Sequence, residues 1–221
     1  MTAPLIVGLG GTLRDGSTSE RALRIALAEA ERLGARTRIF AGQLLNLPAY
    51  DPAEPTRSVA AAELVEALHE ADGIIIATPS YHGSISGLIK NAIDYTEDLR
   101  TDGRIYFAGR AVGAIVCADG IQAMGATLAT LRAIVHALRG WPTPFSAVIN
   151  SALKPFGADG SCRDPQVAQQ LAFVAEQVVE FAHMRRLHDA TRFDSGNARR
   201  HPGGENPQGS RLIELTLEFM N

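Results

Sequence analysis

The sequence predicts an α/β protein in which helices cover both faces of a parallel β-sheet. Short apolar runs, of which residues 71–77 and 111–118 are the clearest, have the length of strands buried on both faces. Segments with helical spacing of apolar residues follow these runs, and loops rich in Gly, Ser and Thr join the two. Strands that alternate with helices favour a parallel sheet, because right-handed crossovers place the helices on its faces.

The first strand and the loop after it form the most informative stretch. Residues 5–9 are an apolar run, and residues 10–19 form a loop rich in Gly, Ser and Thr with a single arginine, Arg14. Ser17 and Glu20 have the spacing of a capping box, so a helix is expected to begin there. Unpaired amides and the helix dipole attract an anion at this position, and hydroxyl groups and Arg14 would add donors. The stretch predicts a phosphate site.

Two common phosphate-binding loops do not match this stretch. No Gly-Lys-Ser/Thr follows the glycines, so the loop is not a Walker A motif. Gly8 and Gly10 begin like a dinucleotide fingerprint, but Leu13 stands at the third glycine position, where close helix–strand packing requires a small residue. On this stretch alone a simple tight turn remains the alternative, although the arginine and the hydroxyl groups exceed what a turn needs.

The next elements follow in order along the chain. Residues 21–33 carry apolar side chains at helical spacing, and Gly34 ends this helix. Residues 36–40 are the second predicted strand. Residues 44–56 contain three prolines and form an irregular surface loop, after which Ser58 can cap another helix.

The third strand, residues 71–77, is expected to stop at Pro79, because proline removes a ladder donor. A second loop of small residues then leads into a helix whose apolar positions lie between residues 88 and 95. Residues 111–118 form the fourth strand, and the helix after it reaches about residue 138.

Residues 145–150 supply the fifth strand. Asp164 and Pro165 then suit the N-cap and first positions of a helix that reaches about residue 185. The simplest arrangement of five such strands is the flavodoxin-like order 2-1-3-4-5, with the ligand crevice where the first and third strands diverge. Three loops of small residues follow the carboxyl ends of strands, so they are expected to meet at one rim; they cover residues 10–19, 79–87 and 118–125.

Two of these loops resemble the NAD(P)H-dependent FMN reductase family. Gly10-Gly-Thr-Leu-Arg-Asp-Gly-Ser-Thr-Ser19 is similar to the family's G-S-L-R-x-G-S-x-N. Thr78-Pro-Ser-Tyr-His-Gly-Ser-Ile-Ser-Gly-Leu-Ile-Lys-Asn-Ala-Ile-Asp-Tyr95 is similar to its P-x-Y-N-G-S-x-P-G-x-L-K-N-A-x-D-W. The resemblance covers about residues 4 to 182. It implies a flavodoxin-like fold, non-covalent FMN, NADPH or NADH as reductant, and a homodimer or homotetramer.

The resemblance also implies roles for individual residues. The FMN phosphate would be held by Thr12, Arg14, Ser17 and Ser19, and the hydroxyl of Thr18, in the same loop, could add a donor. The isoalloxazine ring would be bordered by the second loop and by the third, through Pro79, Ser80, Tyr81, His82, Gly83, Ser84, Asp119 and Gly120. Thr12, Ser19 and His82 depart from the family's usual Ser, Asn and Asn, and the third loop lacks the family's run of glycines. Because hydride transfer takes place on the cofactor, no catalytic side chain is expected.

Composition excludes several other classes of function. The net charge of -3 gives no reason to expect binding to nucleic acid or to an anionic membrane. The two cysteines, Cys117 and Cys162, have neither the spacing of a zinc site nor that of a disulfide framework. No apolar run approaches the roughly 20 residues of a membrane helix. We therefore expect a cytoplasmic protein without a metal.

The expected activity is an FMN-dependent NAD(P)H oxidoreductase with ping-pong kinetics. The acceptor would be a free flavin, a quinone, an azo compound or a metal oxyanion, and a flavin-dependent monooxygenase is a possible partner if reduced flavin is exported. The alternative is a flavodoxin-like electron carrier without direct NAD(P)H oxidation; carriers of that kind are usually strongly acidic, unlike this chain.

The end of the chain differs from the rest. Residues 1–186 are expected to form the FMN-binding domain, and residues 187–221 a C-terminal extension. Residues 195–209 are rich in Gly, Pro, Asn and Arg and are typical of a linker. Apolar and polar residues alternate over residues 211–219, which predicts a short strand that pairs with a sheet edge or a neighbouring subunit.

Overall fold

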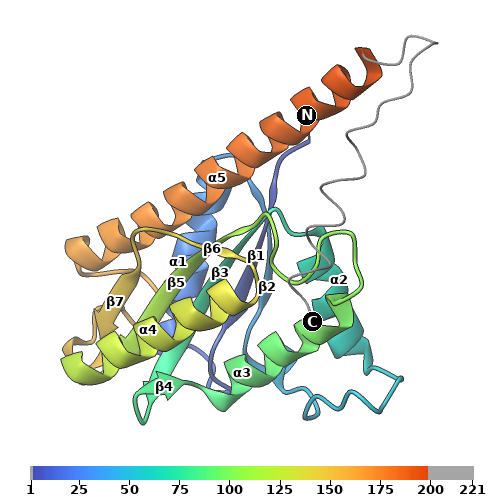
Figure 1. The fold of residues 1–221 in the computed structure, drawn as a ribbon. Coiled ribbons are helices and arrows are strands. Elements are labelled where there is room, and N and C mark those ends of the chain that lie inside the picture. Colours follow the sequence, from blue (N-terminus) through green and yellow to red (C-terminus); the bar gives the residue numbers. More distant parts are fainter. Residues whose placement is uncertain (1, 199–221) are drawn as a thin grey trace. The chain divides into compact units, whose positions relative to one another are not determined.

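The computed structural model of the chain describes residues 2–198, with side chains up to residue 191 (Figure 1). The first compact unit ends at Arg185, and the fold below is that of this unit. Its strands are β1 (Leu5–Gly10), β2 (Arg36–Phe40), β3 (Gly73–Tyr81), β4 (Ser84–Ile85), β5 (Ala111–Ala118), β6 (Trp141–Pro142) and β7 (Ala147–Asn150). The helices are α1 (Thr18–Arg32), η1 (Gly42–Leu45), α2 (Val59–Glu70), α3 (Gly87–Asp94), η2 (Tyr95–Leu99), α4 (Ile121–Ala137), η3 (Ser151–Leu153) and α5 (Pro165–Ala198).

The parallel sheet has the order β2-β1-β3-β5-β6, and β7 also pairs with β5. The predicted order 2-1-3-4-5 is therefore confirmed, with one difference at the edge. Two short strands, β6 and β7, share the fifth position, whereas a single strand over residues 145–150 was expected. Pro142 and Pro144 explain the interruption, since neither can donate a ladder hydrogen bond.

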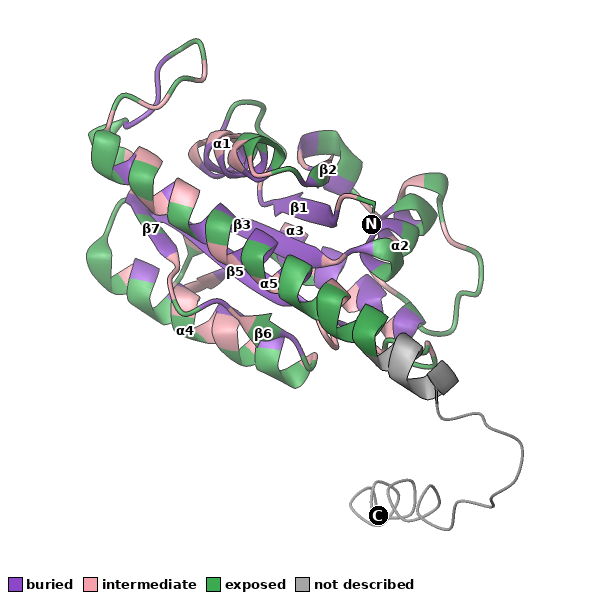
Figure 2. Ribbon diagram, turned by 90° about the horizontal axis from the view of Figure 1, so that it is seen from above, coloured by how far each residue is buried: buried purple, intermediate pink, exposed green. Residues whose placement is uncertain are grey.

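Helices cover both faces of the sheet (Figures 1 and 2). Alternate residues of one strand point to opposite faces, so Ile74 and Ile76 pack with α2, α3 and α4, while Ile75 packs with α1 and α5. Both sides of the central strands are buried, as the uninterrupted apolar runs predict. The parallel strands all point the same way, and the segments that follow them meet at one rim.

The third strand does not stop at Pro79 as predicted. β3 continues to Tyr81 and then turns back as β4, with Ser80 opposite Ile85. Pairing with β1 ends at Ala77, so β3 has an open side beyond that residue and proline is tolerated there. The turn consists of His82 and Gly83, with φ of 53° and 77°. Two positive φ values in succession are what a two-residue type I′ hairpin turn requires.

Two helix ends also differ from the prediction. α4 begins at Ile121, so most of the expected third loop is the first helical turn and only Asp119 and Gly120 connect it to β5. α5 runs to Ala198 instead of ending near residue 185. Residues 186–194 contain neither Pro nor Gly, so their sequence does not interrupt a helix. The remainder of the predicted linker and the predicted strand over residues 211–219 lie outside the described residues.

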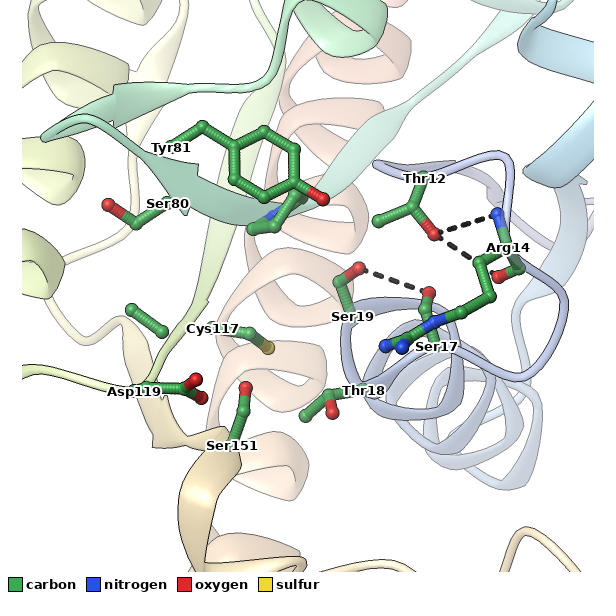
Figure 3. A pocket seen from close by; sticks show the side chains of 12 residues that line it. Thr12, Arg14, Ser17, Thr18, Ser19, Ser80, Tyr81, Cys117, Asp119 and Ser151 are labelled. Carbon is green, nitrogen blue, oxygen red and sulfur yellow. Dashed lines mark hydrogen bonds between the residues drawn. The ribbon is translucent and has the colours of Figure 1, made fainter.

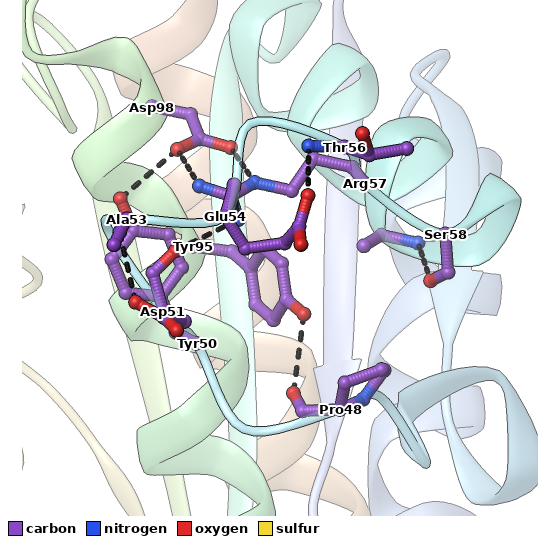
Figure 4. Close-up of polar contacts among 11 residues, drawn as sticks. Pro48, Tyr50, Asp51, Ala53, Glu54, Thr56, Arg57, Ser58, Tyr95 and Asp98 are labelled. Atoms are coloured by element: carbon purple, nitrogen blue, oxygen red, sulfur yellow. Dashed lines mark hydrogen bonds and ion pairs between the residues drawn. The ribbon is translucent and has the colours of Figure 1, made fainter.

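The long loop between η1 and α2 is fastened to α3 and η2 (Figure 4). The guanidinium of Arg57 donates two hydrogen bonds to the carboxylate of Asp98, at 2.7 and 2.8 Å, and its carbon lies 4.7 Å from the centre of the Tyr50 ring. The hydroxyl of Tyr50 also donates to Asp98, at 3.0 Å. On α3, Asn91 accepts a hydrogen bond from the amide of Tyr50 and donates one to the carbonyl of Pro48. The Asn of the second motif therefore holds this loop.

None of the helices in the described part of the chain has both the length and the apolar character that a membrane crossing requires.

Candidate functional site

The start of α1 has the cap that the sequence predicts, in a modified form. The hydroxyl of Ser17 accepts a hydrogen bond from the amide of Glu20 at 3.3 Å. The carboxylate of Glu20 accepts from the amide of Gly16 at 3.0 Å, one residue before the position that a standard capping box uses. Arg24 also donates to this carboxylate, at 2.8 Å. The negative charge of Glu20 is thus paired within the helix and does not oppose an anion at its start.

The loop between β1 and α1 is closed by its own side chains. The hydroxyl of Thr12 accepts from the amide of Arg14 at 3.2 Å and donates to the carbonyl of Arg14 at 3.1 Å. The hydroxyls of Ser17 and Ser19 are 3.4 Å apart and both residues are buried. The side chain of Arg14 is exposed at the surface of the loop. Hydroxyls, amides and a guanidinium are therefore gathered at the start of one helix.

A cavity of about 200 Å³ connects this loop to the ends of β3, β5 and β7 (Figure 3). Nine of the residues selected from the motifs line it, namely Thr12, Arg14, Ser17, Thr18, Ser19, Pro79, Ser80, Tyr81 and Asp119. The other four do not line it. His82, Gly83 and Ser84 lie at the turn and in the return strand of the hairpin, and Gly120 is the N-cap residue of α4.

Three further residues line the cavity that motif analysis did not select, namely Cys117, Ala118 and Ser151. Each lies at the carboxyl end of a parallel strand or directly after it. The rule that ligands bind at these ends would have identified them from the predicted strands alone. Ser151 in particular follows β7, whose predicted counterpart ends at the same residue, Asn150.

The hydroxyl of Ser80 is directed out of the cavity. It donates to the carbonyl of Ala123 at 3.1 Å and lies 2.6 Å from the hydroxyl of Thr127, a fully buried residue of α4. Ser80 therefore fastens the hairpin to α4. The next residue, Tyr81, has its side chain 55% exposed at the rim.

Cys117 contributes a thiol to the cavity wall (Figure 3). Burial raises the pKa of this thiol to about 12, so it stays protonated at neutral pH. A protonated thiol is a poor nucleophile and a poor metal ligand. Among the described residues, no group of three or more His, Cys, Asp and Glu side chains is placed to hold a metal ion.

The donors at one end of the cavity suit the phosphate of FMN. Four hydroxyl-bearing residues and one guanidinium line this end of the cavity. The carboxylate of Asp119 belongs to a different part of the lining, because Asp119 follows the end of β5. The loop is also packed closely against β3, since a Cβ on Gly11 would lie 2.6 Å from Cδ of Pro79. Only glycine allows this approach. It brings the β1–α1 loop, which is the predicted phosphate site and is called the phosphate loop below, next to Pro79, the first residue of the predicted ring-binding segment. The residues present therefore fit the cofactor.

Comparison with known proteins agrees with this fit. A family model described as NADPH-dependent FMN reductase matches residues 4–154. The NADPH-dependent FMN reductase ArsH of Shigella flexneri is 30% identical over 216 residues, which are 96% of this chain and 82% of that protein. An FMN-dependent NADPH-azoreductase of Staphylococcus aureus is 33% identical over 123 residues, 55% of this chain and 62% of that protein.

Solved structures show the same fold. FerB of Paracoccus denitrificans, described as a flavoenzyme NAD(P)H:(acceptor) oxidoreductase, has a TM-score of 0.63 at 24% identity, over 83% of this chain and 99% of that one. The NADH:FMN oxidoreductase EMOB has a TM-score of 0.62 at 23% identity, over 82% and 90%. The family model spans more than half of the chain, and the ArsH match spans nearly all of it. The chain belongs to the NADPH-dependent FMN reductase family.

Proposed function

We propose that this chain binds FMN in the cavity between the β1–α1 loop and the β3–β4 hairpin. NAD(P)H would be oxidised there, and the electrons would pass to a small organic acceptor. Membership of the family makes the chain an NAD(P)H-dependent flavin oxidoreductase. One observation carries the placement of the cofactor. A donor set suited to a phosphate and a hairpin able to support a ring line the same cavity.

Each side of the cavity would have its own task. Thr12, Arg14 and residues 17–19 would hold the phosphate through hydroxyls, amides and one positive charge. Pro79, Ser80 and Tyr81 of the hairpin would support the isoalloxazine ring, and Asp119 would border the far edge of that ring. Bound FMN supplies the hydride chemistry, so the protein's part is to bind and orient it.

The acceptor we favour is a planar aromatic compound such as a quinone, an azo dye or a free flavin. Tyr81 and Ile121, on the two elements that Ser80 joins, have exposed fractions of 55% and 80%. Apolar surface of this kind at a rim suits an aromatic ligand better than a metal oxyanion. Export of reduced flavin would require a monooxygenase partner.

Two further features belong to the proposal. We expect a homodimer or homotetramer, as the family resemblance implies. Both cysteines are free, which fits a reducing, cytoplasmic environment.

Titration of the apoprotein with FMN and with riboflavin tests the placement of the phosphate. Arg14→Met should raise the FMN dissociation constant about 10- to 150-fold, because a hydrogen bond to a charged group contributes about 1.5–3 kcal/mol. Its affinity for riboflavin, which has no phosphate, should not change. Arg36→Met is the matched control, since Arg36 is exposed and lies beside Leu5 at the opposite end of the sheet.

A second measurement tests the reaction. FMN-loaded protein mixed with NADPH under argon should lose its yellow absorbance. Protein that takes up no FMN contradicts the site, and protein that takes up FMN but is not bleached contradicts the oxidoreductase activity.

A further inference from the structure

Ser86 stands at the start of α3 and connects three segments of the chain. Its side chain is buried, with 2% of the residue exposed. The hydroxyl accepts a hydrogen bond from the amide of Ile89 at 3.2 Å and donates one to the carbonyl of Gly11 at 3.0 Å. The amide of Ser86 donates to the hydroxyl of Thr78 at 3.1 Å, and that hydroxyl donates to the carbonyl of Pro79 at 2.8 Å.

These hydrogen bonds join the two halves of the proposed cofactor site. Gly11 belongs to the loop that would hold the phosphate, while Thr78 and Pro79 lead into the hairpin that would support the ring. The hydroxyls of Ser86 and Thr78 are both buried, so water does not compete for their partners. A shift of either segment would break a buried hydrogen bond, which links the position of the phosphate loop to that of the hairpin.

The residue at this position departs from the family pattern given above, which has proline two residues after the Ser of the hairpin. Proline has no amide hydrogen and no hydroxyl, so it could donate neither to Thr78 nor to Gly11. The backbone at Ser86 has a φ of -65°, which proline also adopts. The connection through Ser86 is therefore an addition to the hairpin rather than a requirement for forming it.

We propose that Ser86 is a positioning residue that couples the phosphate loop to the ring-supporting hairpin, so that the two ends of FMN bind cooperatively. The proposal rests on the proposed function, because it assumes FMN in this cavity. Ser86 does not line the cavity, and it would act through the carbonyl of Gly11 and the hydroxyl of Thr78. A flavin without the phosphate would gain little from this coupling.

The test compares the binding of FMN and of riboflavin in the wild-type protein and four variants. In Ser86→Ala and Ser86→Pro, the ratio of the riboflavin to the FMN dissociation constant should fall about threefold to tenfold, the usual range for one or two buried hydrogen bonds. Ser86→Thr retains both donors, the hydroxyl and the amide, and should keep the wild-type ratio. Ser58→Ala is the matched control, because Ser58 caps α2 with the same geometry, accepting from the amide of Ala61 at 3.3 Å.

A purely structural role for Ser86 gives a different result. Loss of a helix cap destabilises the protein and weakens both ligands equally, so the ratio would stay at the wild-type value, as it should in Ser58→Ala. An unchanged ratio in Ser86→Pro, or in Ser86→Ala if that variant folds, overturns the proposal. Failure of the wild-type protein to bind FMN is a separate outcome, which overturns the proposed function instead.

Discussion

Gly11 is the position where a single added methyl group should disturb the site most. A Cβ there would lie 2.6 Å from Cδ of Pro79, 2.8 Å from the carbonyl oxygen of Ala77 and 2.9 Å from Cα of Thr78. Carbon atoms in contact are normally about 3.5–4.0 Å apart, so the loop would have to retreat by roughly 1 Å. Two of these atoms belong to the backbone of β3, which is paired on both sides at Ala77 and cannot yield easily.

Gly11→Ala should therefore reduce both stability and cofactor affinity. Overpacking of this kind costs about 1–3 kcal/mol of the free energy of unfolding. The retreat would also lengthen the hydrogen bond from Ser86 to the carbonyl of Gly11, now 3.0 Å, beyond bonding distance. The displaced phosphate loop should also bind FMN more weakly, by about tenfold in the dissociation constant for each ~1.4 kcal/mol of binding free energy that is lost.

Urea unfolding followed by circular dichroism measures the first effect, and quenching of FMN fluorescence measures the second. Gly125→Ala is the control, because Gly125 lies within α4 with nothing within 4 Å of the added methyl. That control should be stabilised by about 0.5–1 kcal/mol, as Ala is the better helix former. A Gly11→Ala protein with the unfolding midpoint and FMN affinity of the wild type would refute the close packing of the phosphate loop on β3.

Two further predictions concern the Arg57–Asp98 contact, which fastens the loop between η1 and α2, and the hairpin turn at His82 and Gly83. Asp98→Asn should destabilise the protein by about 1–3 kcal/mol at neutral pH. The hydrogen bond from Arg57 holds the pKa of Asp98 below its ordinary value of 3.8, so this contribution is complete above that value and is lost as the pH falls through the lowered pKa. Urea unfolding of wild type and variant should converge in acid; a constant difference would contradict the assignment. His82→Asn should raise the free energy of unfolding by about 1 kcal/mol, and with it the melting temperature, because Asn tolerates the φ of 53° better than His. Calorimetry checks this, and a lower melting temperature would count against a type I′ turn.

Local chemistry explains which parts of the site could be predicted from sequence. The cap at Ser17 and Glu20 depends on residues within one turn of helix, so its pattern is visible without the fold. The apolar runs likewise indicate buried strands directly, and the bounds of β2 and β5 agree with the prediction. Pro79 misled the prediction of β3, because the rule against proline holds for strands paired on both sides and β1 ends before that residue.

Contacts between distant residues account for what sequence could not provide. The motif selects Ser80 as a residue beside the ring, yet its hydroxyl is bound to Thr127, which is 47 residues further along the chain. Ser86 shows the opposite case, since it departs from the motif, was not among the selected site residues, and has its partner Gly11 75 residues away. A motif therefore indicates which positions lie near the cavity, whereas the fold decides whether a side chain at such a position faces the cavity or holds the residues that do. Affinity for FMN should depend on both groups, and residues of the second group, such as Ser86, are the ones proposed to couple the β1–α1 loop to the hairpin.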